Sequence, residues 1–315
     1  MRARPPAGTK RWRPVGAAAG GMLDLILGEP PDQVHPLRAF GALMTRLESF
    51  LYRRSRLAGS LYAAAGVAAG VLAGRSIGST ALASYVAIGG QSLAGAAQAV
   101  EHALDVGDLD AARQAARWLV GRDVAGLDET ELSRAAVESV AENTVDAVVA
   151  PLLYSALWGA CGALGYRAVN TLDAMVGYRN ERYQQFGWAS ARLDDLANLV
   201  PARATALLIM LLQPKTAGTI WRTVRRDAPG HPSPNAGVAE SAFAAALGVR
   251  LGGANSYGGK VELRALMGDG RPPRPADVGR AVALSRRVGI AAAVISAGVG
   301  VARALRRPFF IMEQA

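Results

Sequence analysis

The chain has 315 residues, of which 51% are apolar and 19% are charged. Soluble proteins carry about a quarter charged residues, so this composition argues against a soluble protein. The formal net charge of +10 does not indicate nucleic-acid binding, because the basic residues form runs beside apolar blocks and lack interleaved aromatic residues for base stacking.

The N-terminal residues 1–21 are basic at their start, and we expect them to form a disordered leader. Residues 22–315 are then a single membrane-embedded domain. The apolar stretch 15–27 is too short to span a bilayer, since about 20 residues are needed. We therefore expect an interfacial helix or a re-entrant segment there.

Five segments are apolar enough to be membrane spans, and we expect an all-α, polytopic integral membrane protein with amphipathic helices and polar loops between the spans. Pro201 predicts a kink in the fourth segment. Arginines at both ends of the short fifth segment can extend their side chains to the membrane surface. The five segments are 57–74, 76–100, 147–166, 196–213 and 288–302.

The polar segments indicate the orientation of the chain. Residues 214–287 hold twelve Lys and Arg against five Asp and Glu, which favours the cytoplasmic side. The segment 101–146 reads as amphipathic helices, with Asp108, Asp110 and Asp128 near helix starts, where a carboxylate meets the positive end of the helix dipole.

The first group of residues that could take part in a reaction is an acidic stripe. In ESVAENTVDAVVAPL, residues 138–152, Glu138, Glu142 and Asp146 are four residues apart and share one helix face. Three like charges repel each other unless a cation or basic partner lies there, and magnesium prefers such oxygen ligands. Alternatively, the face is solvated and paired with Arg134.

Two further strings carry charged and polar residues between apolar blocks. Residues 170–203 crowd aspartates, arginines and tyrosines at a membrane boundary, where ionisable groups are expensive and usually functional; an interfacial set of ion pairs with an aromatic belt is the alternative. In residues 231–260, Asn235 can cap the following helix, and the glycine-rich LGGANSYGGK offers an anion cradle. That loop departs from a Walker A motif, and it can equally be a flexible turn.

The fourth string, DLILGEPPDQVHPLRAFG, residues 24–41, gathers Asp24, Glu29, His35 and Arg38 around three prolines. A lone histidine is more often structural than catalytic. No nucleophile elbow, HExxH zinc motif or dinucleotide-binding loop is present. The single cysteine, Cys161, excludes an internal disulfide.

Taken together, these four strings resemble the adenosylcobinamide-phosphate synthase family of cobalamin biosynthesis, CobD/CbiB. The likeness runs in order from about residue 22 to 305. One departure is Glu29, where the family often has Asp, which retains the carboxylate. The resemblance implies a multi-pass enzyme of the cell (inner) membrane.

The implied reaction joins the free carboxylate of adenosylcobyric acid to the amine of (R)-1-amino-2-propanol or its O-phosphate, with ATP as co-substrate and Mg²⁺ as cofactor. We expect metal or base roles for Glu138, Glu142, Asp146, Asp173, Asp194 and Asp195, with Glu142, Asp146, Asp194 and Asp195 as the metal ligands. Substrate binding falls to His35, Arg38, Asn143, Arg179, Arg182, Arg203, His231, Asn235, Asn255, Tyr257 and Lys260. The expected partners are the corrinoid and amine substrates, the lipid bilayer and other late enzymes of the pathway.

The sequence leaves alternatives open for both the membrane topology and the function. If 147–166 crosses the membrane fully, residues 170–195 face away from the other strings. We therefore expect one of 147–166 and 196–213 to be re-entrant, kinked or partly inserted, with Pro151, Pro201 and Arg203 permitting this. The competing function is a permease or binding protein for a corrinoid or another large anion. A membrane scaffold for other pathway enzymes is the third alternative.

Overall fold

A computed structural model describes residues 15–30, 35–257 and 260–305, and it is helical apart from one hairpin. The elements are α1 (Gly16–Leu27), α2 (Pro36–Leu51), α3 (Arg56–Ile77), α4 (Thr80–Ala87), α5 (Gly90–Asp105), α6 (Leu109–Ala116), α7 (Glu129–Thr144), the π-helical turn η3 (Val145–Val149), α8 (Ala150–Val176), α9 (Tyr183–Phe186), α10 (Trp188–Leu212), α11 (Ala217–Asp227), η4 (Ala228–Gly230), α12 (Ala236–Leu247), β1 (Leu251–Tyr257), β2 (Lys260–Met267) and α13 (Pro275–Leu305).

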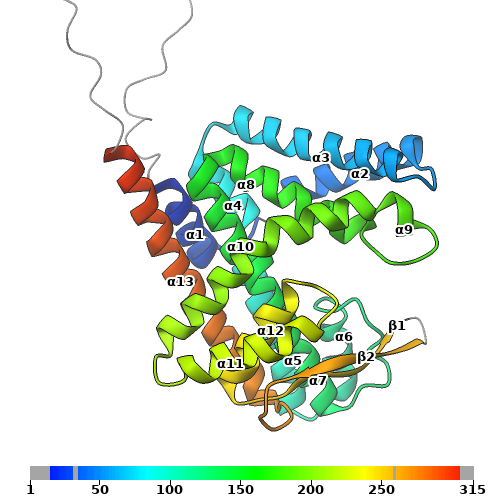
Figure 1. The fold of residues 1–315 in the computed structure, drawn as a ribbon, viewed down its shortest axis with the longest axis vertical. Coiled ribbons are helices and arrows are strands. Elements are labelled where there is room, and N and C mark those ends of the chain that lie inside the picture. Colours follow the sequence, from blue (N-terminus) through cyan, green and yellow to red (C-terminus); the bar gives the residue numbers. More distant parts are fainter. Residues whose placement is uncertain (1–14, 31–34, 258–259, 306–315) are drawn as a thin grey trace, which may run out of the picture.

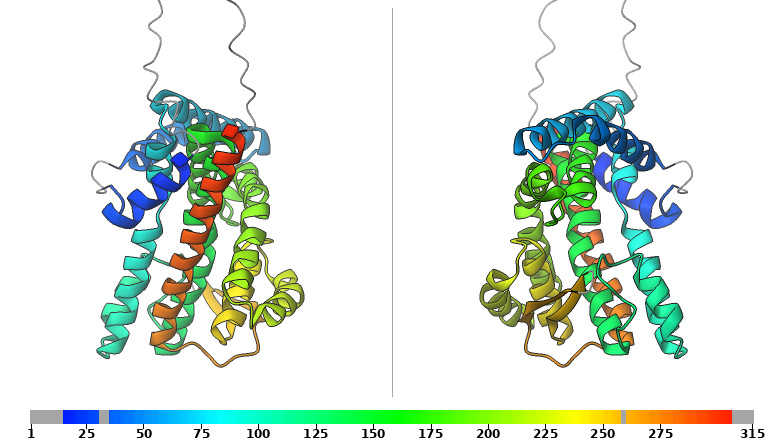
Figure 2. Two further views of the ribbon diagram at one scale, coloured as in Figure 1. Left: turned by 90° about the vertical axis from the view of Figure 1, so that its left-hand side faces the viewer. Right: turned by 90° about the vertical axis from the view of Figure 1, so that its right-hand side faces the viewer.

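Four helical stretches in the described residues are long and apolar enough to cross a membrane: Arg56–Ile77, Glu129–Val176, Trp188–Leu212 and Pro275–Arg303. They confirm the predicted all-α polytopic membrane fold. Helix α13 runs the length of the molecule beside α7 and α8 (Figure 2). The predicted span 76–100 is wrong as a single helix. It divides into α4 and α5 because Ile88 is extended and the Gly89 N–H donates to the carbonyl of Ala147 instead of continuing the helix.

Small residues allow α3 to pack closely along the second half of α8, as expected where helices associate in lipid. A Cβ atom on Gly70 would lie 2.6 Å from the Leu164 carbonyl oxygen, and one on Gly74 would lie 2.4 Å from that of Ala160. The same holds for α1 and α4, where a Cβ on Gly20 would lie 2.3 Å from Ser84 Cβ. Residues 16–21 therefore belong to the folded domain, and the predicted leader is too long at its C-terminal end.

The expected kink in one of the two central segments is confirmed in 147–166. Gly159 has φ 64° and ψ −145° within α8, so the helix changes direction there, in a backbone region that favours glycine. The first half of α8 continues the direction of α7, and the second half lies along α3 (Figure 1). The bend is at Gly159 and not at Pro151, which lies in the first turn of α8, where proline is tolerated.

In the glycine-rich string, residues 251–257 form β1 and Lys260 begins β2, so these residues are strands and not the predicted loop. β1 and β2 pair antiparallel, and their hairpin lies at the end of the molecule opposite α3 (Figure 1). Two helix starts are as predicted: Asp108 accepts from the Ala111 N–H at 2.9 Å, and Asp128 forms a capping box with Glu131. The start of α12 is also correct, but its capping side chain is Ser233, which accepts from the Ala236 N–H, and not Asn235.

Candidate active site

A polar cavity of about 520 Å³ lies between α7, α8, α10, the start of α12 and the hairpin. Three of the four strings singled out in the sequence contribute to it. The carboxylates that line it are Glu138, Glu142, Asp146, Asp173, Asp194, Asp195, Glu240 and Glu262, and the cations are Arg122, Arg179 and Arg264. Acidic groups outnumber basic groups, so the cavity attracts cations.

Asp146 and Asp194 share a hydrogen-bond donor in the cavity. The Asn170 side-chain amide donates to both, at 3.2 Å to Asp146 Oδ2 and 3.3 Å to Asp194 Oδ1. Asn198 donates to the other oxygen of Asp194 at 3.0 Å and accepts from the Tyr166 hydroxyl at 2.8 Å. Asp146 lies in the π-helical turn, a feature that occurs frequently at functional sites. This network therefore fixes two repelling carboxylates side by side.

Glu138 anchors the hairpin to α7. Its Oε2 accepts from Arg122 at 2.8 Å, and its Oε1 accepts from the Gly252 N–H at 2.8 Å. Arg122 also donates to Asn255, and Arg134 donates to the carbonyls of Gly252 and Ala254. Because the Gly252 N–H is already occupied, it is unavailable for the predicted anion cradle. Arg134 contacts the hairpin backbone and forms no pair with the acidic stripe among the contacts in the described residues.

His231 closes one side of the cavity. Its Nε2 lies 3.6 Å from Glu240 Oε1, and both side chains are buried. Arg264 donates to Nε2 at 3.2 Å, and the Ser233 backbone contacts Nδ1. Burial lowers the pKa of His231 below its usual value of 6.5, so the ring is neutral at physiological pH. A neutral ring can accept a proton.

Several predicted residues lie away from this cavity. Arg182 bonds to Glu48 at 2.9 Å and lies over the Tyr52 ring at 4.4 Å, in a cluster between α2 and α9. His35 caps α2 by accepting from the Leu37 N–H, and Arg38 is exposed on that helix. Neither lines the cavity.

Asn143 donates to the Ser139 carbonyl within its own helix. Asn235 lines a small adjoining cavity with Asp146 and Asp194, and Arg203 lines a neighbouring pocket. The side chains of Tyr257 and Lys260 lie outside the described residues.

Sequence reasoning missed Arg122, Asn170, Glu240 and Arg264, which the fold brings to the cavity. Asn170 is the first residue of the string 170–203, but it is neutral, so it did not stand out among the charged residues of that string. The available signal for Glu240 was a lone carboxylate within the otherwise apolar stretch 236–247, which folds into α12.

The donor set of the cavity is compatible with magnesium. In the described part of the chain, no three His, Cys, Asp or Glu side chains converge to hold a metal ion alone. Magnesium, however, usually takes one or two carboxylates and completes its ligands with water and substrate phosphates. The linked pair Asp146 and Asp194 fits that requirement better than the full predicted set, since Asp195 is paired with Arg192 at 3.3 Å.

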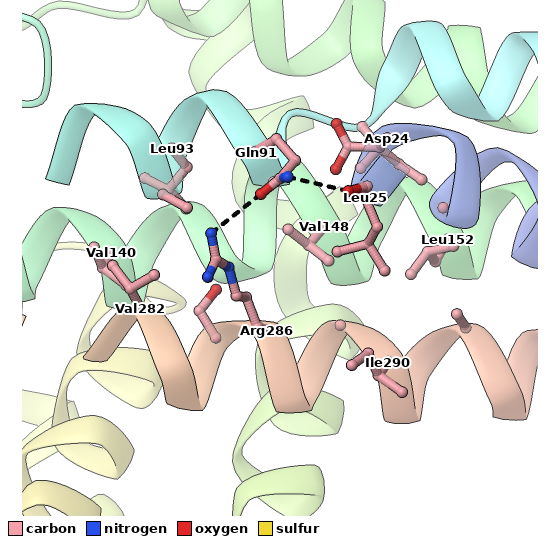
Figure 3. Close-up of a pocket in the computed structure, with 17 residues that line it drawn as sticks. Asp24, Leu25, Gln91, Leu93, Val140, Val148, Leu152, Val282, Arg286 and Ile290 are labelled. Carbon is pink, nitrogen blue, oxygen red and sulfur yellow. Dashed lines mark hydrogen bonds between the residues drawn. The ribbon is translucent and has the colours of Figure 1, made fainter. Parts of the chain in front are cut away.

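A second cavity is apolar, and Figure 3 shows the side chains that line it. Val140, Val148 and Ile290 line it together with Asp24. Asp24 is 2% exposed, and burial, followed by the nearby Glu29, raises its pKa to about 6. Asp24 lines this second cavity, and none of the described residues of the fourth string lines the polar cavity.

The fold and the polar cavity together define a polytopic helical membrane protein that gathers acidic and basic side chains from distant segments into one site. A family model described as CobD/Cbib protein matches residues 17–285. The chain belongs to this family, which confirms the resemblance seen in the sequence and supports a role in cobalamin biosynthesis.

Individual relatives cover most of the chain. The cobalamin biosynthesis protein CobD of Mycobacterium tuberculosis (strain ATCC 25618 / H37Rv) is 48% identical over 303 residues, 92% of this chain and 96% of that protein. The protein of the same name from Geobacter metallireducens is 47% identical over 275 residues, 81% and 86% of the two chains. That of Rhodobacter capsulatus is 43% identical over 284 residues, 84% and 90%. No solved structure matches the chain.

Proposed function

We propose that the chain is an amide synthase of cobalamin biosynthesis. It joins the free carboxylate of adenosylcobyric acid to the amine of (R)-1-amino-2-propanol or its O-phosphate, with ATP as energy source. The observation that carries this proposal is that carboxylates from residues 138–152, 170–203 and 231–260 line one cavity with arginines, in a member of this family.

The chemistry requires activation, because a carboxylate is a poor electrophile. The γ-phosphoryl group of ATP is transferred to a carboxylate oxygen, which gives an acyl phosphate and ADP. The neutral amine nitrogen then attacks the acyl carbon, the bond from that carbon to the phosphate-bearing oxygen breaks, and phosphate leaves. The nitrogen loses one proton to a base.

The cavity residues divide into groups that suit these steps. Arg179 and Arg264 can bind the corrinoid carboxylate and the transferred phosphoryl group. Asp146 and Asp194 would hold magnesium, which screens phosphate charge when it is bound. Neutral His231 can accept the amine proton, and Glu240 at 3.6 Å stabilises the imidazolium that forms.

The proposal is tested with purified protein in nanodiscs. Adenosylcobyric acid, aminopropanol phosphate, ATP and magnesium are added, and the coupled corrinoid is detected by mass. We expect product only when all four components are present, and its loss in Glu142→Gln at equal protein level.

The same experiment separates the alternatives. A permease or binding protein gives corrinoid flux in proteoliposomes without a covalent product. A scaffold leaves the pathway intact when Glu142 is changed to Gln. Either result contradicts the proposed reaction.

A further inference from the structure

A pocket of about 720 Å³ adjoins the acidic cavity and lies between α10, α11 and α12. Its floor is apolar and includes Leu207 and Met210 from α10 and Trp221 from α11. Trp221 is 52% exposed, so part of its indole is open to a ligand. The pocket therefore offers a surface on which a flat, apolar group can stack.

Cations surround this apolar floor. Arg192, Arg203 and Arg225 line the pocket, and no carboxylate stands among its lining residues in the described part of the chain. The Arg225 guanidinium lies over the Trp221 ring, 5.6 Å from its centre, so a cation and an aromatic ring meet in this pocket. The pocket thus has the opposite charge to the neighbouring cavity and is complementary to an anion.

The pocket and the acidic cavity share a wall made by His231 and Pro232. Three polar contacts form their border. Arg192 pairs with Asp195 of the cavity, and Arg203 donates to Asn235, which in turn donates to the Asp195 carbonyl at 2.7 Å. A ligand long enough to pass this border would meet arginines first and carboxylates second.

We infer that this pocket binds the nucleoside and proximal phosphates of ATP. The inference deepens the proposed function and rests on it. An acidic cavity repels a bare polyphosphate, so the nucleotide must enter from a cationic side, with its terminal phosphates directed toward Asp146 and Asp194, which would hold magnesium. The base stacks on Trp221, Arg225 and Arg203 bind phosphate oxygens, and the γ-phosphoryl group reaches the corrinoid carboxylate in the cavity.

The test measures nucleotide binding and not turnover. Protein in nanodiscs is titrated with a fluorescent ATP analogue, which MgATP then displaces. Trp221→Ala removes the stacking surface, and Leu207→Trp fills the pocket without changing its charge. We expect each change to weaken MgATP binding about tenfold or more, the order of one lost base–aromatic stack.

Arg222→Ala is the matched control, because among the described residues the Arg222 side chain bonds within α11, to Gly218 and Thr219, and it does not line the pocket. Its affinity for MgATP should equal that of the wild type. Binding of adenosylcobyric acid, followed by its visible absorption, should be unchanged in all three variants and shows that they are folded.

Unchanged MgATP affinity in Trp221→Ala and Leu207→Trp overturns the assignment of this pocket. Loss of corrinoid binding with normal MgATP binding also overturns it and assigns the pocket to the corrinoid. A wild-type protein that binds no MgATP contradicts the ATP dependence of the proposed function itself, so the two failures are distinguishable.

Discussion

Glu138 of α7 forms a buried ion pair with Arg122, which lies in the segment before α7, and both side chains also bond to the hairpin, at Gly252 and Asn255. The side chains of Arg122 and Glu138 are 4% and 11% exposed, and their atoms lie 2.8 Å apart. Removal of one partner from a buried pair leaves the other charge uncompensated, which costs about 3–5 kcal/mol. Glu138→Ala also removes the acceptor of the Gly252 N–H. We therefore expect Glu138→Ala to lower the free energy of unfolding by about 3–5 kcal/mol.

The assay is thermal unfolding in nanodiscs, followed by intrinsic tryptophan fluorescence. A loss of this size should lower Tm by about 6–15 °C in a chain of this length. Arg122→Met should cost as much, since it leaves Glu138 without its cation. The double variant Glu138→Leu with Arg122→Met should recover at least half of the loss, because replacing both charges by apolar groups is often neutral.

Wild-type stability in Glu138→Ala would refute the reasoning. So would a double variant that is less stable than either single variant, because the two charges would then act independently. The matched comparison is Glu129→Ala at the exposed start of α7, which should change Tm little.

Three further changes test other parts of the molecule. Asn170→Leu, which removes the donor shared by Asp146 and Asp194, should lower the coupling rate by about two orders of magnitude, measured by mass detection of product. Gly70→Val should reduce stability by about 1–3 kcal/mol in thermal unfolding, because α3 and α8 must separate. Burial lowers the pKa of His231 in the folded protein, so protonation of the ring destabilises the fold. The stability contributed by the neutral ring is present above about pH 6.5 and is lost as pH falls. His231→Gln should therefore flatten the pH dependence of Tm between about pH 7 and 5.

Each of these has its own control. Gly95→Ala on α5, where no atom lies within 4 Å of an added Cβ, should be neutral or stabilising, and equal losses at both glycines contradict the packing argument. An Asn170→Leu protein with normal activity would remove the reason for assigning Asp146 and Asp194 to the reaction. An unchanged pH dependence in His231→Gln would show that the ring titrates alike in folded and unfolded chains.

Apolar run length predicted most of the helices, because the cost of exposing backbone polar groups in lipid leaves few other solutions. It failed at 76–100, where a tertiary bond from Gly89 to Ala147 interrupts the run. The glycines at 251–257 predicted a loop, but these residues form a strand, whose conformation depends on pairing with the following segment and on Arg134, which lies more than a hundred residues earlier.

The candidate site was predicted in part. Charges stood out in the sequence wherever they interrupted apolar blocks, so Glu142, Asp146, Asp173 and Asp194 were found. Arg122 was not singled out because it lies in a polar segment, where charged residues are common. Arg182 was predicted to bind substrate because it stands beside apolar segments. In the structure it packs against two tyrosines and bonds to Glu48 instead.

The most direct test of the account follows oxygen from the substrate carboxylate. Adenosylcobyric acid labelled with ¹⁸O in its free carboxyl group is coupled in the presence of ATP, and the released phosphate is examined by mass. Activation as an acyl phosphate predicts one ¹⁸O atom in the inorganic phosphate formed with each amide bond. Amide formation with unlabelled phosphate, or with the label in AMP, would contradict this mechanism.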